Sequence, residues 1–314
     1  MAHIKFIFIV FLSLTIFSCG SKPEPPLRIG SNSWPGYEPL YIARDEGYYD
    51  NTSVKLVALS SASDVISALR TNNLEGAALT LDESLTLLED GIKVKIILIM
   101  DFSHGGDVLL AKPYINTLED LKDKIIAVET TAVGAILLDG ALDSAGLNVS
   151  DITIKNCSVD KHLECYDTVD AIVTFDPADS QLRNKGAKLI FDSSQIPGRI
   201  VDVLVVKESV IKAHAASVSQ LIKGYFKARE LLEKDPMKAA KSMAPRLNLS
   251  AEAVLASFNG IKLPSLAENH QLLDEQNSTL IPTIQKLSTI MHKKGLLRRE
   301  ISDPHMTSSQ FLPK

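Results

Sequence analysis

Carboxylate side chains follow several apolar segments of this sequence, at positions where few basic residues accompany them. Asp101 and Asp107 flank a short glycine-containing stretch after one such segment. Asp176 follows a second apolar segment, and Asp202 begins a third, with Arg199 as the main basic side chain nearby. Carboxylates bind cations and hydrogen-bond donors. The pattern therefore favours a small nitrogen-bearing ligand, such as an amine or an amino-substituted heteroaromatic ring.

Aromatic and hydroxyl side chains supply further candidate contacts. Trp34 and Tyr37 lie in a loop constrained by Pro and Gly, where their rings suit stacking on a planar or cationic ligand. The alternative, that Trp34 packs within its own domain, stays open. Thr80 stands at the end of an expected strand and is a candidate ligand contact. Thr130 and Thr131 stand where an expected helix begins, and there they contact a ligand, cap the helix or do both. The candidate ligand-binding residues are Trp34, Tyr37, Thr80, Asp101, Asp107, Thr130, Thr131, Asp176 and Asp202.

Catalysis and metal binding find little support in the sequence. Cys157 and Cys165 either form a disulfide or remain free buried thiols, and both readings give them a structural role. Together with His162 they do not have a standard zinc spacing. A cysteine nucleophile would need a base within hydrogen-bond reach, and neither cysteine lies in a strand-end loop. We therefore expect no enzyme, no catalytic residue, no metal and no cofactor.

Short β-branched segments alternate with amphipathic segments along most of the chain, and they would position these residues. This order predicts an α/β fold with mostly parallel sheets covered by helices on both faces. Strands are expected at residues 27–30, 54–59, 76–80, 93–100, 125–128, 152–156, 171–174 and 188–191. One helix is expected to end at residue 43, and another to begin at a capped start at 117–120. Ser63 is the expected N-cap of a helix at 63–70, and Asp82 that of a helix at 82–89. Further helices are expected at 132–145, 217–233, 236–244, 251–258 and 271–294.

Two segments share a pattern that divides the chain. Asp107–Lys112 and Asp202–Lys207 both read Asp-Val-Leu-apolar-apolar-Lys, and they bracket a second run of strands and helices. Coincidence between two apolar strands is the alternative. We interpret them as two hinge connections, with lobe one at residues 27–107 plus 205–314 and lobe two at 108–204. A ligand between such lobes would lie beyond the carboxyl ends of the strands and be buried on closure.

The N-terminus has the features of an export signal. An apolar or hydroxyl run reaches Ser18 and is too short for a resident membrane helix. Cys19 follows as in a lipobox, which predicts a signal peptide at 1–18 and a lipid on Cys19. A cleaved signal with a chance cysteine is the alternative. Residues 19–26 read as a proline-rich tether, and Gly20 leaves open whether the inner or the outer membrane holds the lipid.

Composition excludes one class of partner. The net charge is −5 and the sequence has no block of basic residues, so nucleic acid is not expected to bind. With 45% hydrophobic and 23% charged residues the chain is typical of a globular protein. No later apolar run is long enough to cross a membrane. We expect an exported monomeric lipoprotein, periplasmic or on the cell surface, that binds a small molecule.

The order of several motifs resembles that of ABC-transporter solute-binding proteins, in the group that binds nitrate, sulfonates, taurine or thiamine precursors. The motifs lie at residues 34–44, 101–107, 170–177 and 196–202. The resemblance covers nearly all of residues 27–300. It implies the two-lobed type II periplasmic-binding fold, in which two strands form the hinge. It also implies a ligand in the interlobe cleft and delivery to a permease and an ATPase.

Three alternatives to uptake of a nitrogen-bearing ligand stay open within this resemblance. A sensory lipoprotein that reports to a membrane kinase or cyclase would need the same closing cleft. A sulfonate or taurine binder would need cationic or amide donors near the anion, and the strand-end loops offer little beyond Arg199. An enzyme of thiamine-pyrimidine metabolism would need a placed nucleophile, which the cysteines do not supply.

Overall fold

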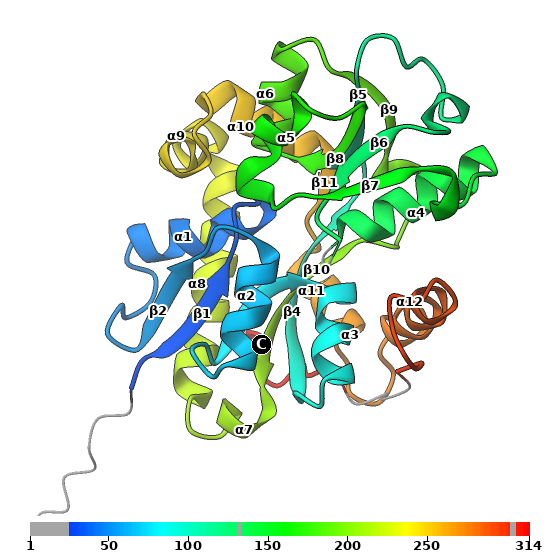
Figure 1. Ribbon diagram of the computed structural model, residues 1–314. Helices are drawn as coiled ribbons and strands as arrows, with labels where there is room; N and C mark the ends of the chain where they lie inside the picture. The colour runs from blue at the N-terminus through cyan, green and yellow to red at the C-terminus, as the bar shows by residue number, and fades with distance from the viewer. Residues whose placement is uncertain (1–24, 131–132, 302–305) are drawn as a thin grey trace, which may run out of the picture.

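The computed structural model describes residues 25–130, 133–301 and 306–314. They form two α/β lobes, each a twisted sheet with helices packed against it (Figure 1). The predicted signal peptide, Cys19, most of the tether and Thr131 lie outside the described residues. Within those ranges, no helix combines the length and the apolar character needed to cross a membrane.

The sheet of the first lobe has the strand order β11-β4-β10-β3-β1-β2. Strand β1 pairs in parallel with β2 and β3, whereas β10 and β11 pair antiparallel with their neighbours. Its strands are β1 at Leu27–Ser31, β2 at Val54–Ala58, β3 at Gly76–Thr80, β4 at Val94–Ser103, β10 at Val201–Lys207 and β11 at Ile261–Lys262.

The sheet of the second lobe has the order β7-β6-β8-β5-β9. Strand β6 pairs in parallel with β7 and β8, whereas β5 pairs antiparallel with β8 and β9. Its strands are β5 at Asp107–Ala111, β6 at Ile125–Val128, β7 at Thr153–Asn156, β8 at Ala171–Phe175 and β9 at Lys188–Asp192. The mostly parallel sheets that the sequence predicts are thus present in both lobes, each with an inserted antiparallel strand.

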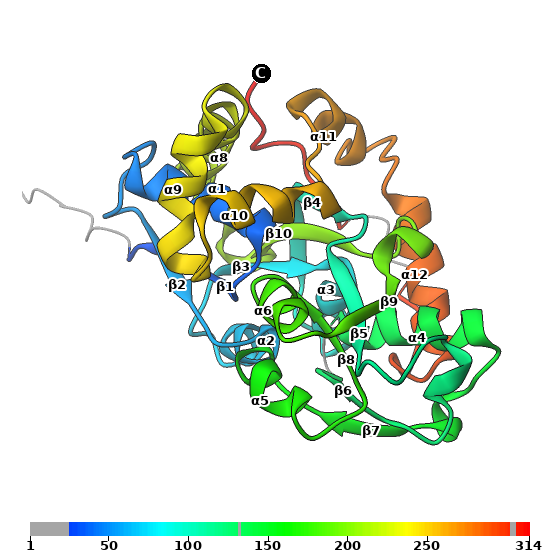
Figure 2. The ribbon, with the colours of Figure 1, turned by 90° about the horizontal axis from the view of Figure 1, so that it is seen from above.

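Helices lie on both faces of the first sheet, with α1 and α8 on one side and α2 and α3 on the other (Figure 2). The helices of the first lobe are α1 at Glu38–Asp45, α2 at Ala62–Arg70, α3 at Leu81–Glu89, α7 at Glu208–Ile211, α8 at Ala215–Lys234, α9 at Pro236–Leu247, α10 at Ala251–Ser257, α11 at Leu266–Leu272 and α12 at Ile281–Lys293. Those of the second lobe are α4 at Gly134–Ala145, α5 at His162–Tyr166 and α6 at Ala178–Asn184.

The two strands with the shared sequence pattern, β5 and β10, occupy equivalent places. Each follows a crossing of the chain between lobes and inserts antiparallel between two strands of its sheet. Every residue of both strands is buried, which explains their apolar character on both faces. Because β10 pairs along its whole length within the first sheet, we propose lobe borders in 103–107 and 192–201, not within β10 at 204/205.

Two helix caps differ from the sequence prediction. Ser61, not Ser63, caps α2, because Ser61 has extended backbone angles and its hydroxyl accepts the Asp64 N–H. Thr80, not Asp82, is the N-cap of α3, with Glu83 completing a capping box. In both cases the cap is the last residue with extended backbone, which the order of residue types alone does not reveal.

Two helical predictions also change. The expected helix at 271–294 is broken, since the Asp274 carboxylate accepts the N–H groups of Gln276 and Asn277 in a turn, and α12 begins only at Ile281. The expected capped start at 117–120 gives no α-helix but a single 3-10 turn at Glu119–Leu121.

Cys157 and Cys165 are joined by a disulfide. The bond closes the loop that leads from β7 into α5 of the second lobe. His162 and Val159 lie within this closed loop. The disulfide therefore fixes the segment that carries these two side chains.

Candidate ligand-binding site

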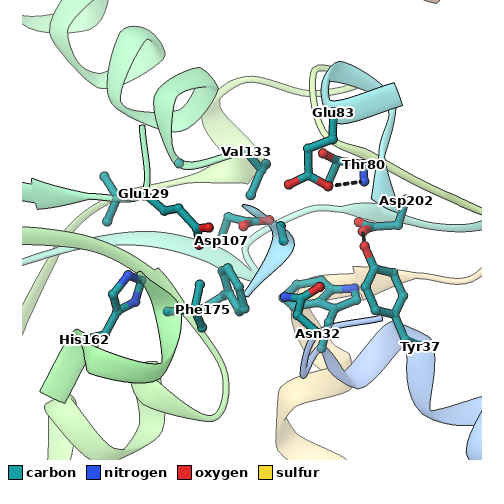
Figure 3. Close-up of a pocket in the computed structure, with 15 residues that line it drawn as sticks. Asn32, Tyr37, Thr80, Glu83, Asp107, Glu129, Val133, His162, Phe175 and Asp202 are labelled. Carbon is teal, nitrogen blue, oxygen red and sulfur yellow. Dashed lines mark hydrogen bonds between the residues drawn. The ribbon is translucent and has the colours of Figure 1, made fainter. Parts of the chain in front are cut away.

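A cavity lies between the lobes and encloses about 480 Å³ free of protein atoms, part of it open to solvent. Side chains of both lobes converge on it (Figure 3). The first lobe contributes Asn32, Trp34, Tyr37, Ala62, Thr80, Glu83 and Asp202, and the second lobe contributes Asp107, Glu129, Val133, Gly134, Val159, His162, Val173 and Phe175. Most of these residues stand at or just beyond strand ends, where open α/β sheets bind ligands.

Two aspartates from neighbouring strands lie on the first-lobe side, Asp202 in the cavity lining and Asp101 behind Trp34. Asp202 of β10 and Asp101 of β4 are register partners. The Tyr37 hydroxyl donates to Asp202 Oδ1 at 2.6 Å, and Trp34 Nε1 donates to Asp101 Oδ2 at 3.1 Å. Burial raises the pKa of Asp101 to about 7, and burial together with the Asp101 charge raises the pKa of Asp202 well above its usual range. The pair therefore retains a proton at neutral pH.

Two more carboxyl groups border the cavity. Burial raises the pKa of Asp107 to about 7, although its N–H is fixed by the Ser103 hydroxyl at 3.1 Å. Glu83 accepts the Thr80 N–H at 2.9 Å, and burial plus the nearby charge of Asp82 raises its pKa to about 8. The Thr80 N–H therefore fixes the Glu83 carboxyl group, and burial leaves both carboxyl groups ready to release a proton to solvent when a cation approaches.

The opposite wall presents a neutral imidazole and a further carboxyl group. His162 Nδ1 lies 2.9 Å from the Thr174 hydroxyl oxygen, and burial lowers the pKa of the ring to about 4. Its Nε2 is buried and makes no hydrogen bond within the described part of the chain. Glu129 extends from the end of β6 toward the same space (Figure 3). Burial raises the pKa of Glu129, opposed by hydrogen bonds from Ser63.

An aromatic contact joins the lobes beside the cavity. The rings of Trp34 and Phe175 meet edge to face, with centroids 5.4 Å apart. Trp34 thus packs against the second lobe as well as its own. The same residue borders the cavity, and its stacking on a ligand stays a prediction.

The predicted candidates fall into three groups. Trp34, Tyr37, Thr80, Asp107 and Asp202 line the cavity, and Asp101 stands directly behind Trp34, fully buried. Thr130 and Asp176 lie elsewhere: Thr130 bonds to Asn156, and Asp176 accepts the Ser180 N–H at the start of α6. Thr131 is outside the described residues.

The structure adds lining residues that the sequence reasoning did not select. They are Asn32, Glu83, Glu129, His162 and Phe175, together with small apolar residues. Glu129 and Phe175 follow strands, so the rule applied to other strand ends would have included them. Glu83 and His162 stand in the first turns of α3 and α5, and no local pattern distinguishes them from helix-capping or surface residues.

Positive charge is scarce at this site. Among the described residues that line the cavity there is no Lys or Arg, and His162 is neutral. Arg246 is occupied nearby, because its guanidinium holds Glu38 at 2.6 Å and stacks over the Tyr41 ring. In the ranges that the structure describes, no three Asp, Glu, His or Cys side chains are arranged to hold a metal ion. The cavity is therefore suited to a hydrogen-bond-donating or cationic organic ligand.

Two α/β lobes with a cavity between them define the periplasmic binding protein fold. The alkanesulfonate-binding protein SsuA from Xanthomonas axonopodis pv. citri, bound to MOPS, superposes with a TM-score of 0.73 at 20% identity, covering 88% of this chain and 96% of that one. The ligand-binding component of an ABC-type import system from Staphylococcus aureus, with zinc bound, gives 0.75 at 13% identity, covering 92% and 98%.

The periplasmic nitrate-binding protein NrtA from Synechocystis PCC 6803 gives a TM-score of 0.62 at 11% identity, covering 72% of this chain and 68% of that one. No curated protein matches the chain in sequence. The family model described as NMT1-like matches residues 20–248. The chain belongs to the NMT1-like family.

Proposed function

We propose that this protein captures a small amino-bearing organic solute in the interlobe cavity and delivers it to an ABC importer. One observation carries the choice of ligand: the cavity borders Glu83, Asp107, Glu129 and Asp202, with no Lys or Arg among its described lining residues. Donor N–H groups or a positive charge on the ligand would satisfy these acceptors. Trp34 adds an aromatic face for a planar or cationic group.

The ligand class sets this protein apart from the sulfonate- and nitrate-binding proteins that share its fold. An anion in the cavity would meet buried carboxyl groups and no cationic partner, so its desolvation would not be offset. A sulfonate or taurine ligand is therefore the weaker alternative. The ligand is expected to be compact, such as an alkylamine or an aminopyrimidine, because part of the 480 Å³ free of protein atoms is open solvent.

Binding without catalysis is the simpler reading of the site. The two cysteines of the described chain are joined to each other, so neither serves as a nucleophile. A role in sensing, with a membrane kinase or cyclase as partner, uses the same closing cavity. Incubating the purified protein with a bound ligand and measuring the ligand mass before and after distinguishes binding from turnover.

We further propose a lipid anchor on Cys19 and a monomeric, exported protein. The lipobox-like residues before Cys19 support the anchor, and the family match begins one residue later, at residue 20. Labelling cells with a radioactive fatty acid tests this proposal. Incorporation into the wild type but not into Cys19→Ser is expected, and equal labelling of both would contradict it.

A thermal-shift panel tests the ligand class. Propylamine and 4-aminopyrimidine are expected to raise Tm, whereas ethanesulfonate and taurine are expected to leave it unchanged. Asp107→Asn serves as the matched variant, because it keeps the shape of a lining residue but removes its charge. Stabilisation by the sulfonates without stabilisation by the amines would contradict the proposal.

A further inference from the structure

Glu129 of the second lobe reaches across the interface to a helix of the first lobe. Its Oε1 accepts the backbone N–H of Ser63 at 3.1 Å and also the Ser63 hydroxyl. Ser63 lies in the first turn of α2, whose N-cap is Ser61. The N–H groups of a first turn have no partner within the helix and carry partial positive charge. The carboxylate thus closes the gap between the lobes at a position where a helix favours negative charge.

The second oxygen of the same carboxyl group has no hydrogen bond within the described part of the chain, in a side chain that lines the ligand cavity. Glu129 lines that cavity and is 5% exposed. Its Oε2 is buried and has no hydrogen-bond partner among the described residues, although the Val159 N–H lies near enough to lower the pKa of the group. Figure 3 shows the side chain directed into the cavity from the wall that also carries His162. One carboxyl group therefore makes a hydrogen bond between the lobes and also lines the ligand cavity.

We propose that Glu129 couples ligand binding to lobe closure, with Oε1 holding α2 of the opposite lobe and Oε2 accepting an N–H of the ligand. The coupling rests on the proposed amino-bearing ligand in this cavity. Closing the lobes removes water from the carboxyl group, and one oxygen then lacks a partner, which is costly. A ligand that donates to Oε2 removes this cost only in the closed form, so it shifts the equilibrium toward closure.

Contacts elsewhere in the interface act without this dependence on ligand. Lys294, which follows α12 of the first lobe, lies 2.7 Å from both Asp139 and Asp143 of α4 in the second lobe. These groups do not line the cavity. They hold the lobes together whether or not a ligand is present, whereas the Glu129 carboxyl group both bonds to α2 and lines the cavity.

Glu129→Gln is the decisive variant. The amide keeps an oxygen that accepts from Ser63, but it is neutral and can present an N–H₂ donor to the cavity. Desolvating a neutral amide costs less than desolvating an ion. The variant is therefore expected to close more readily without ligand, and to bind propylamine about tenfold more weakly or worse, since a charged hydrogen bond is lost.

Spin labels at exposed Lys185 and Lys241, each replaced by Cys, would measure the interlobe distance by electron–electron double resonance. These positions belong to the second and first lobes and flank the surface between α6 and α9. Ser63→Ala is expected to reduce the closed population with and without propylamine. Ser67→Ala, an exposed position on the same helix, is the matched control and is expected to change neither.

The outcomes separate the coupling from the proposed function. A rise in the closed population of ligand-free Glu129→Gln, together with weaker propylamine binding, supports the coupling. If the closed population and the propylamine affinity of Glu129→Gln both fall, Glu129 is an ordinary interlobe contact and the proposed coupling is overturned. Unchanged propylamine affinity would also overturn it. If the wild type binds no amine, the proposed ligand class fails, and the ligand-free distances alone decide whether Glu129 opposes closure. Circular dichroism establishes that each variant is folded.

Discussion

The Tyr37 hydroxyl donates to the Asp202 carboxylate across 165 positions of sequence, at 2.6 Å. This bond ties the loop after β1 to the strand that returns from the second lobe. Asp202 is in turn the register partner of Asp101, which holds Trp34. The aromatic loop is thereby fixed at the crossing strands, so the position of Trp34 depends on the geometry of the hinge.

Replacing Tyr37 by Phe should destabilise the protein. The change removes one donor and leaves Asp202 Oδ1 buried without it, which costs about 1–3 kcal/mol. Urea unfolding should show a lower midpoint with an unchanged slope. Tyr48→Phe is a suitable control, because Tyr48 is more exposed and its ring, not its hydroxyl, makes the described contact with Lys227. Equal stability of Tyr37→Phe and wild type would contradict the role assigned to the bond.

Stability should fall as pH rises from about 5 to about 7. Burial raises the pKa of Asp107 to about 7, whereas an unfolded aspartate has a pKa near 3.9. Between these values the folded state binds more protons than the unfolded state, so the unfolding free energy decreases with rising pH. The slope from one such group is at most about 1.4 kcal/mol per pH unit. Asp107→Asn should be less pH-dependent than wild type in denaturant titrations, and parallel curves would argue against the raised pKa.

Affinity for a cation should increase as pH rises, whereas stability decreases. Because Asp107 and Glu83 have pKa values raised to about 7 and about 8, both become charged between pH 6 and pH 8. An alkylammonium stays protonated throughout this range. The Kd for propylamine, measured by calorimetry, should therefore decrease as pH rises. A Kd that is constant or that increases over this interval would show that these groups do not face the ligand.

Removing the disulfide should weaken both stability and binding. The Cys157–Cys165 bond closes the loop that carries Val159 and His162 of the cavity wall. Loss of a cross-link that closes a loop of this length is expected to lower the free energy of unfolding by about 2–3 kcal/mol, because the unfolded chain gains entropy. Replacing both cysteines by Ser should lower Tm and raise the Kd for propylamine. A lower Tm with unchanged Kd would mean that the cavity wall holds its shape without the bond.

Gly260 should not tolerate a side chain. A Cβ at this position would lie 2.5 Å from the Gly106 backbone nitrogen, where β11 meets the crossing between lobes. Because the obstructing atoms belong to the backbone, Gly260→Ala forces a shift that costs about 1–3 kcal/mol. Asn259→Ala, at an exposed neighbouring position, is the control. Thermal unfolding of the two variants should differ clearly, and equal Tm values would contradict the close packing of the crossing.

Much of the fold could be predicted from the sequence, because strand identity depends on local patterns. Short apolar runs placed β3 and β6 at their observed bounds, and α4 ends at Ala145 as predicted, where Gly146 has left-handed backbone angles. The repeated pattern identified β5 and β10, since an inserted strand buried on both faces must be apolar throughout. The sequence did not predict the break between α11 and α12, because the break depends on a short polar turn around Asp274.

By itself the sequence determined which residues follow strands, and the rule that ligands lie beyond strand ends selected Trp34 and Tyr37. Only the tertiary structure decided which polar groups meet in one cavity. Thr130 faces Asn156, whereas Glu83 and His162 join the site from helix starts. It also decided their protonation, since the pKa of a carboxyl group depends on the water that distant segments exclude. Proximity and desolvation arise from packing between lobes, and no local pattern of residues contains them.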